Sequence, residues 1–191
     1  MKIYDISQEL FHSNIYPGDE YPTFERTMKI ADGEVCNLTV LKMCAHNGTH
    51  VDAPYHFYDD GKTIDCLDLS RVIGKCTVVS CQGELTSSDV DEIMKTAQPR
   101  VLLKGDVVVT LEAAKQFNQY HVLLIGNESQ TVGPLYAPKP IHLELLKEEV
   151  VLLEGVVLTH VPDGDYLLNA APINLGGADG APCRAVLIQE D

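Results

Sequence analysis

The chain has 191 residues, of which 45% are hydrophobic and 22% charged, and its formal net charge is −14. A chain of this length buries enough apolar surface to fold without a disulfide or structural metal, and we expect one domain spanning residues 1–191. The acidic balance argues against nucleic acid as a partner, since phosphate binding relies on clustered Lys and Arg. No apolar run reaches the roughly 20 residues that span a membrane.

The first half of the chain shows extended segments separated by turns. Strands are predicted at 2–10 and 23–31, with a turn at Tyr16-Pro17-Gly18-Asp19 between them. From Leu38 the alternation NLTVLKMCAH predicts a further strand that runs into the segment 46–56. A turn at 59–62, a helical turn near 66–72 and a strand at 75–81 are expected to follow.

The second half adds helices between strands. Ser88 with Asp91 three residues later is a capping-box pattern and predicts a helix over 88–97. Thr110 is expected to cap a second helix that lies between two strands. The remaining elements are strands at 101–104 and 121–126, a short helix at 141–149 that follows Pro140, a strand at 150–158, and a Gly-rich loop with a closing strand in 173–188. Strands outnumber helices, which predicts a mixed α/β fold.

The cysteines show no CxxC pair, and a chain of this size does not need disulfides to fold. We therefore expect reduced thiols, used as small core residues, in a cytoplasmic protein. The residues concerned are Cys36, Cys44, Cys66, Cys76, Cys81 and Cys183.

The segment HNGTHVDAPYH, residues 46–56, holds three of the seven histidines and one aspartate. Gly48, Pro54 and the β-branched residues argue against a helix there, so we predict a strand. Alternate side chains of a strand share one face. The even-numbered residues His46, Gly48, His50, Asp52, Pro54 and His56 would then lie on one side, with Gly48 leaving room between two imidazoles.

Clustered imidazoles with a carboxylate are ligands that Zn2+ prefers. Without a cation, such a face would gather several polar groups with few partners. The alternative is a solvated or hydrogen-bonded histidine face, which we consider the less favoured reading of so dense a cluster.

A second signal lies about a hundred residues downstream. Glu154 interrupts an aliphatic run that is expected to form a buried strand, and a buried carboxylate generally finds a proton or a cation. His142, on the predicted helix just before, is a candidate neighbour. From these residues alone, an edge-strand glutamate and a surface histidine remain an equal alternative.

With these motifs in place, the sequence resembles the cyclase-family metal hydrolases, which include bacterial kynurenine formamidase. HNGTHVDAPYH satisfies every fixed position of the family pattern HxGTHxDxPxH. The turn YPGD, the segment IHLELLKEEVVLLEGVVL and the tail VPDGDYLLNAAPINLGGADGAPCRAVL are similar to further family signatures, so the resemblance covers nearly the whole chain. It implies a swivelling β/β/α domain with mixed sheets and flanking helices, assembled as a homodimer or homotetramer.

The resemblance also implies roles for individual residues. His46, His50 and Asp52 would bind a first divalent metal ion, with Asp52 bridging to a second ion that His142 and Glu154 complete. The ions are expected to be two Zn2+, with Mn2+ as the alternative, and His56 would be the general acid and base.

One position departs from the kynurenine formamidases. They carry Trp before the Pro-Gly-Asp turn, whereas this chain has Tyr16 there and no Trp anywhere. Tyr16 is expected to line the substrate pocket with a smaller arene face. The segment GNESQTVG, residues 126–133, is expected to reach the same pocket.

The predicted function is metal-dependent hydrolysis of a C–N amide bond of a small molecule, such as the N-formyl arylamine N-formylkynurenine. The alternatives are an isatin-hydrolase-like opening of a cyclic amide, and a metal-dependent binding protein without turnover. A purely structural zinc site fits less well, because such sites are usually rich in Cys. Outside the site, Arg184 and Asp179 are expected to pair or to shape a loop, while His12, His121 and His160 are expected to be ordinary histidines.

Overall fold

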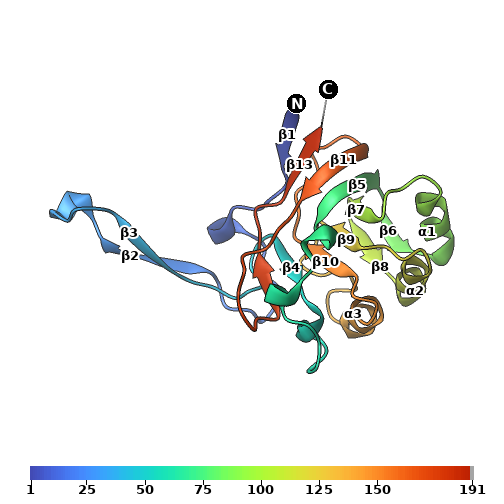
Figure 1. Cartoon of the computed structure of the whole chain (residues 1–191), viewed down its shortest axis with the longest axis horizontal. Coiled ribbons are helices and arrows are strands. Elements are labelled where there is room, and N and C mark those ends of the chain that lie inside the picture. Colours follow the sequence, from blue (N-terminus) through green and yellow to red (C-terminus); the bar gives the residue numbers. More distant parts are fainter. Residues whose placement is uncertain (190–191) are drawn as a thin grey trace.

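The computed structural model describes residues 1–189 and is organised around a curled sheet of nine strands (Figure 1). Its four central strands, β5, β7, β9 and β10, run parallel, and the pairings outside them are antiparallel. In spatial order the strands are β1 (Lys2–Asp5), β13 (Val186–Gln189), β11 (Gly164–Asn169), β5 (Ile73–Ser80), β7 (Arg100–Lys104), β9 (Leu124–Asn127), β10 (Val151–Glu154), β4 (His50–Asp52) and β12 (Gly180–Pro182).

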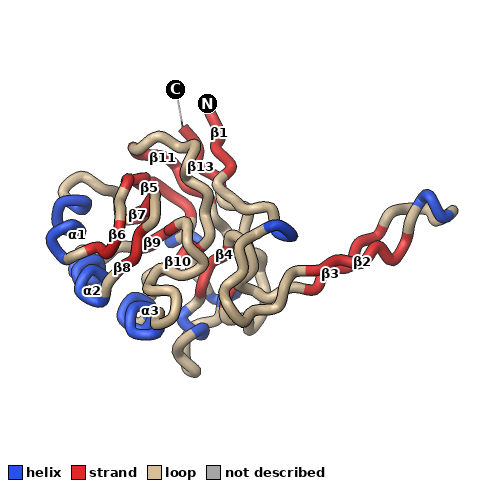
Figure 2. Tube along the Cα trace, turned by 180° about the vertical axis from the view of Figure 1, so that it is seen from behind, coloured by secondary structure: helices blue, strands red, loops and turns tan. Residues whose placement is uncertain are grey.

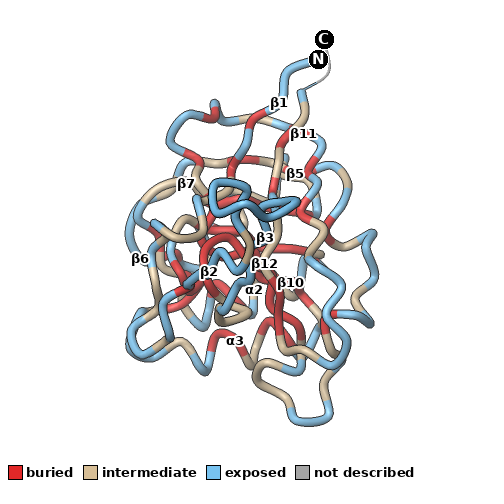
Figure 3. Tube along the Cα trace, turned by 90° about the vertical axis from the view of Figure 1, so that its left-hand side faces the viewer, coloured by how far each residue is buried: buried red, intermediate tan, exposed pale blue. Residues whose placement is uncertain are grey.

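Three α-helices cover one face of this sheet (Figure 2). They are α1 (Ser87–Met94), α2 (Leu111–Gln119) and α3 (Lys139–Leu146), and beside them β6 (Gly83–Leu85) pairs with β8 (Val107–Val109). Leu103 and Leu152 pack into the apolar cluster under the helices, whereas Leu102 and Leu153 pack into the cluster on the opposite face. The central strands are therefore buried on both sides, as parallel strands require (Figure 3).

The helix starts follow the capping residues, with one correction. Thr110 accepts from the backbone N–H of Ala113 and caps α2, as predicted. For α1 the capping box is Thr86 with Asp89, not Ser88 with Asp91. Asp91 instead accepts hydrogen bonds from the side chain of Gln116 on α2 and from the Tyr120 hydroxyl that follows it.

Several strands are shorter than predicted, or were not predicted. The first strand ends at Asp5 instead of continuing to residue 10, and Leu124 rather than His121 begins β9, because His121 lies in a turn with φ +53°. The sequence pattern missed β6, β8, β11 and β12. The described residues also contain five short 3-10 helices, at Leu10–His12, Ile30–Asp32, Pro54–His56, Ile64–Cys66 and Leu69–Arg71. The mixed α/β class is confirmed.

A two-stranded arm projects from the body (Figures 1 and 2). It consists of β2 (Thr23–Met28) and β3 (Leu38–Lys42), which pair antiparallel with each other and, within the described residues, with no other strand. Most of its side chains are exposed, including Phe24, Val40 and Leu41, each just over half exposed. The arm therefore gains little from packing against its own chain.

The sequence also led to predictions about two further features, the length of apolar segments and the state of the cysteines. Within residues 1–189, no helix is both long and apolar enough to cross a bilayer. All six cysteines are free thiols. Cys76 is buried as expected, but Cys36 and Cys66 are exposed, so the expectation that every cysteine serves the core was wrong.

Candidate metal centre

The segment 46–56 is not the continuous strand that the sequence predicts. β3 ends at Lys42, and β4 contains only His50, Val51 and Asp52. His46 lies in the preceding turn, and His56 ends a 3-10 helix that Pro54 begins. Equal parity therefore places only His50 and Asp52 on a shared strand face; the other two imidazoles reach it from a turn and a helical turn.

Gly48 has a different role from the one expected. Its φ is +69°, in the left-handed region that glycine adopts readily. A Cβ there would face Leu10 and Ser13 rather than the space between the histidines. Its carbonyl accepts from Nδ1 of His50 at 3.0 Å and from Nε2 of Gln130 at 3.1 Å, so the turn aims a backbone acceptor at the site.

The sheet brings distant residues to β4. Glu154, at the end of β10, is the antiparallel partner of His50, and Gly180 on β12 is the partner of Asp52. Directly opposed residues of antiparallel strands share a face. Glu154 is therefore beside His50 in space, although about a hundred residues separate them in sequence.

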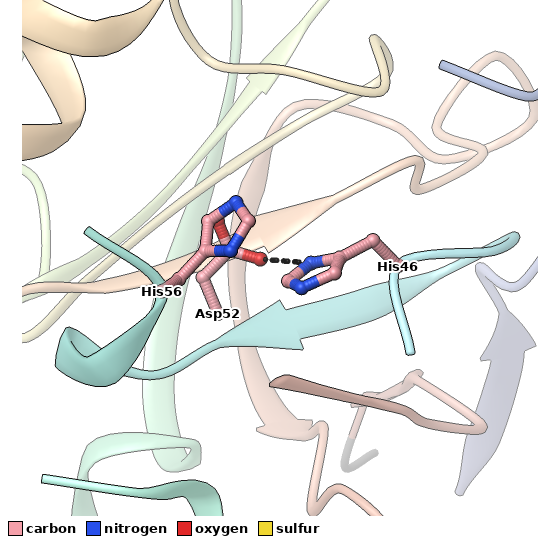
Figure 4. Close-up of side chains that lie close together, drawn as sticks. All are labelled: His46, Asp52 and His56. Atoms are coloured by element: carbon pink, nitrogen blue, oxygen red, sulfur yellow. Dashed lines mark hydrogen bonds and ion pairs between the residues drawn. The ribbon is translucent and has the colours of Figure 1, made fainter. Parts of the chain in front are cut away.

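One oxygen of Asp52 lies close to two imidazole rings. Oδ1 of Asp52 lies 2.9 Å from Nδ1 of His46 and 3.4 Å from Nε2 of His50. Figure 4 shows Asp52, His46 and His56 directed toward one another from three different segments. The coordinating atoms of these three residues all lie within 4.8 Å of one another.

The other oxygen of Asp52 faces the second pair of predicted ligands. Oδ2 lies 3.6 Å from Nε2 of His142, which is in turn 3.2 Å from Oε1 of Glu154. Oε2 of Glu154 lies 3.5 Å from Nε2 of His50, and the backbone N–H of Val132 donates to Oε1. The structure thus brings His142 and Glu154 to the same centre as His46, His50 and Asp52.

Backbone carbonyls orient two of the rings. Nδ1 of His50 lies 3.0 Å from the Gly48 carbonyl, and Nδ1 of His142 lies 3.0 Å from the Pro138 carbonyl. A carbonyl only accepts, so each Nδ1 carries the proton and each Nε2 is turned toward the carboxylates. This is the arrangement by which imidazoles are oriented toward metal ions.

The neighbouring carboxylates favour the protonated form of two of the histidines. Burial alone would lower the pKa of His46, but the charge of Asp52 and the hydrogen bonds to Asp179 and Asp52 outweigh it and raise the pKa to about 11. Burial likewise opposes protonation of His50, yet Asp52 and Glu154 raise its pKa to about 9. His46 and His50 in turn overcome the burial of Asp52 and hold its pKa well below the usual range.

The donor set fits a divalent cation. Nε2 of His50 and Oδ2 of Asp52 are buried and have no hydrogen-bond partner, which is costly for polar atoms unless something else binds them. The coordinating atoms of His50, Asp52 and Glu154 also lie within 4.8 Å of one another. Imidazole nitrogens and carboxylate oxygens in this mixture suit Zn2+ and Mn2+.

A pocket of about 240 Å³ opens onto this centre, and Tyr16, His56 and Phe57 line it together with the histidines predicted as ligands. The Tyr16 hydroxyl donates to the Leu135 carbonyl at 2.8 Å, which holds the ring in place. The Phe57 ring lies against His142, with centroids 4.6 Å apart. The pocket is thus lined both by aromatic side chains and by the histidines and Glu154.

The segment 126–133 reaches the pocket only in part. Gln130 and Thr131 line it. Glu128 accepts from the N–H groups of Gly105 and Leu158 instead. Gln130 was not singled out from the sequence, which offers no periodic or charge signal for it.

Asp179 is the site residue that sequence reasoning misjudged. Its Oδ2 lies 2.8 Å from Nε2 of His46 and 3.3 Å from Nδ1 of His56. Arg184 and Asp179 were expected to pair or to shape a loop; they do not pair, because Arg184 pairs with Asp5 at 2.5 Å. In the sequence, Asp179 is marked only by neighbouring glycines, which indicate a loop and not what the loop faces.

Comparisons with known proteins identify the family and the fold. The Cyclase family model matches residues 4–127. A kynurenine formamidase of Erythrobacter litoralis is 32% identical over 97% of this chain and 93% of its own. A solved structure described as a potential metal-dependent hydrolase with cyclase activity aligns with a TM-score of 0.84 at 25% identity, covering 100% of this chain and 99% of the other. An isatin hydrolase bound to the product analogue thioisatinate has the same fold, with a TM-score of 0.85 at 19% identity over 100% of this chain and 93% of the other.

Proposed function

Because this chain belongs to the cyclase family, we propose that it is a metal-dependent hydrolase that cleaves the amide bond of an N-formyl arylamine such as N-formylkynurenine. The observation that carries the proposal is the convergence of imidazoles and carboxylates on Asp52, beside a pocket with an aromatic wall. The kynurenine formamidase relative supports the amide as the bond that is cleaved.

The cation would be held by His46, His50, Asp52, His142 and Glu154. We propose two ions, Zn2+ or Mn2+, bridged by Asp52. The support is that Oδ1 of Asp52 faces His46 and His50, whereas Oδ2 faces His142. When bound, such cations lower the pKa of water and polarise a carbonyl group.

His56 supplies the proton transfers. It lines the pocket and lies at the edge of the ligand cluster, where its ring stacks on His46 with centroids 4.0 Å apart. Cleavage of an amide requires a proton on the departing nitrogen, because an amide anion is a poor leaving group. An imidazole takes a proton from the attacking water and returns it to that nitrogen near neutral pH.

The pocket wall selects the substrate. Tyr16, Phe57 and Pro138 offer apolar surface against which an arene can lie, and Gln130 and Thr131 offer polar groups. Tyr16 stands where the kynurenine formamidases resembled by this sequence carry Trp. We infer that the pocket accepts an arene of kynurenine size or smaller.

We also propose that the protein is a cytoplasmic homodimer or homotetramer. Six free thiols support a reducing compartment. The arm of β2 and β3 supports self-association, because it exposes several large apolar side chains away from its own core.

The central test combines metal removal with a choice of substrates. Chelation with EDTA should abolish hydrolysis of N-formylkynurenine, and Zn2+ or Mn2+ should restore it, with about two ions bound per chain by elemental analysis. Isatin serves as the comparison substrate. Efficient opening of isatin without cleavage of the formamide would replace the proposed substrate, and turnover that ignores chelation would refute the cation.

A further inference from the structure

Asp179 is held beside the metal centre by its backbone. It directly precedes β12, whose Gly180 is the partner of Asp52 on β4. The backbone N–H of Ala53 donates to the Asp179 carbonyl at 2.9 Å. These backbone contacts fix the loop and leave the carboxylate of Asp179 free for other contacts. The Asp179 side chain is 42% exposed, at the edge of the site.

A single carboxylate oxygen serves two rings. Oδ2 of Asp179 lies 2.8 Å from Nε2 of His46 and 3.3 Å from Nδ1 of His56. The two rings stack with centroids 4.0 Å apart and planes tilted by 31°. Behind His46, a Cβ on Gly180 would lie 2.7 Å from Cε1 of its ring, so the ring is confined between β12 and His56.

The contacts determine which nitrogen of each ring carries a proton. An ionised carboxylate only accepts hydrogen bonds, so His46 must present Nε2–H and His56 must present Nδ1–H. With a cation in place of the second proton of His46, Nδ1, which faces Asp52, would be its ligand nitrogen. His56 is left with Nε2 as the nitrogen that exchanges protons. The two rings need opposite tautomers, and one oxygen selects both.

We propose that Asp179 is a positioning residue that sets the tautomers of His46 and His56 together, and so couples a metal ligand to the acid–base group. For His56 this rests on the proposed function. Carboxylates that accept from ligand imidazoles typically contribute 10- to 100-fold to metal affinity or activity.

The test compares Asp179→Ala and Asp179→Asn with Asp65→Ala. Asp65 is a matched control, because its carboxylate accepts from the backbone N–H of Gly177 on the same loop and from the Thr63 hydroxyl, without reaching an imidazole. Asp179→Ala should weaken Zn2+ affinity, measured by competition with a chromophoric chelator, by about 10- to 100-fold. Asp179→Asn retains an acceptor oxygen and should lie between wild type and Asp179→Ala. Asp65→Ala should keep wild-type affinity.

A second readout follows the tautomers. Nitrogen-15 NMR of the Zn2+-loaded wild type should show the His56 proton on Nδ1 and the His46 proton on Nε2. In Asp179→Ala, His56 should become a mixture of tautomers and kcat should fall about 10- to 100-fold with KM little changed. Asp179→Asn should restore the tautomers.

The outcomes separate the two proposals. Wild-type Zn2+ affinity and an unchanged His56 tautomer in Asp179→Ala would overturn the positioning role. Should that variant fail to fold, Asp179→Leu decides, because its side chain is of similar size and has no acceptor oxygen; wild-type affinity and an unchanged His56 tautomer there would overturn the positioning role equally. A wild-type protein that cleaves no amide would defeat the proposed function, yet the affinity and tautomer measurements would still test Asp179.

Discussion

At the scale of the residue, His56 differs from the other imidazoles of the centre. His50 and His142 are buried, and backbone carbonyls hold their Nδ1 atoms. The side chain of His56 is 29% exposed, lines the pocket and pairs with the carboxylate of Asp179. A group that must exchange protons with substrate needs this access, and a metal ligand does not.

We therefore predict that His56→Ala retains the metal but loses most of its rate. A positioned acid–base group contributes about 10²- to 10⁴-fold, and kcat should fall by that factor while elemental analysis still finds wild-type metal content. His160→Ala is the control, because His160 is exposed and contacts Tyr4, away from the pocket. Undiminished kcat in His56→Ala would remove His56 from the mechanism.

The sequence predicted which residues come together at the centre, but the backbone conformation that brings them together differs from the predicted one. His46 and His50 were grouped by the parity of a regular strand, but β4 holds only three residues and His46 reaches Asp52 from a turn. The grouping succeeded because a short strand flanked by a glycine turn and a proline-initiated helical turn concentrates side chains just as well. Asp179 was not assigned to the centre because its partners, His46 and His56, lie in a different part of the chain.

At the scale of the element, the end of β10 is tied to the motif by buried polar groups. The Thr49 hydroxyl donates to the Gly155 carbonyl at 2.6 Å and accepts from the backbone N–H of Gln8. Nε2 of Gln8 donates to Oε1 of Gln130, and Nε2 of Gln130 donates to the Gly48 carbonyl. That carbonyl also orients His50, so these bonds link the strand end to a predicted ligand.

Gly155 makes this junction possible, and we predict that Gly155→Ala is strongly destabilising. Its φ is +69°, and a Cβ there would lie 2.6 Å from the Gly48 carbonyl oxygen and would also overlap the Gln130 side chain. The left-handed backbone alone costs about 1–2 kcal/mol for alanine, and the overlap should add about 1–3 kcal/mol. Denaturant unfolding of the metal-free protein measures the sum.

Gly83 offers a matched control for that substitution. Its φ is +76°, close to that of Gly155, but nothing lies within 4 Å of the position its Cβ would take. Gly83→Ala should therefore lose only the backbone contribution of about 1–2 kcal/mol. Equal losses in the two variants would show that the packing around Gly155 is not tight.

The strands that were not predicted from the sequence are stabilised by pairing with neighbouring strands. β12 has the sequence Gly-Ala-Pro, which is unfavourable for a strand, yet it pairs with the edge of β4. The helices were easier to predict because their signals are local. Thr110 caps α2 by accepting from Ala113, three residues along the chain, whereas β12 pairs with β4, a strand from a distant part of the sequence.

At the scale of the whole molecule, the likeness to solved structures confirms the expected swivelling β/β/α fold of the cyclase family. The class followed from strands that outnumber helices, and the family from the motif. For the arm, the sequence predicted two strands but not that they project from the body. Local alternation predicts that a segment is extended, but it does not show whether the strand joins the central sheet or leaves it.

The arm carries the last prediction. A two-stranded ribbon is marginal in water, and this one exposes apolar side chains on both faces, since Val40 and Leu41 are consecutive and point to opposite sides. A second copy of the chain would bury them. Because each of these side chains is just over half exposed, its burial stabilises association by about 0.8–1.5 kcal/mol, or about 4- to 13-fold in the dissociation constant.

Val40→Lys and Leu41→Lys should therefore shift the protein toward the monomer, as measured by light scattering across a concentration series. Leu69→Lys is the matched control, because Leu69 is 52% exposed, like Val40, but lies on the body of the molecule. A difference between the two arm variants would identify which face of the ribbon is buried. A monomeric wild type, or assembly that survives both arm substitutions, would show that the arm does not hold copies together.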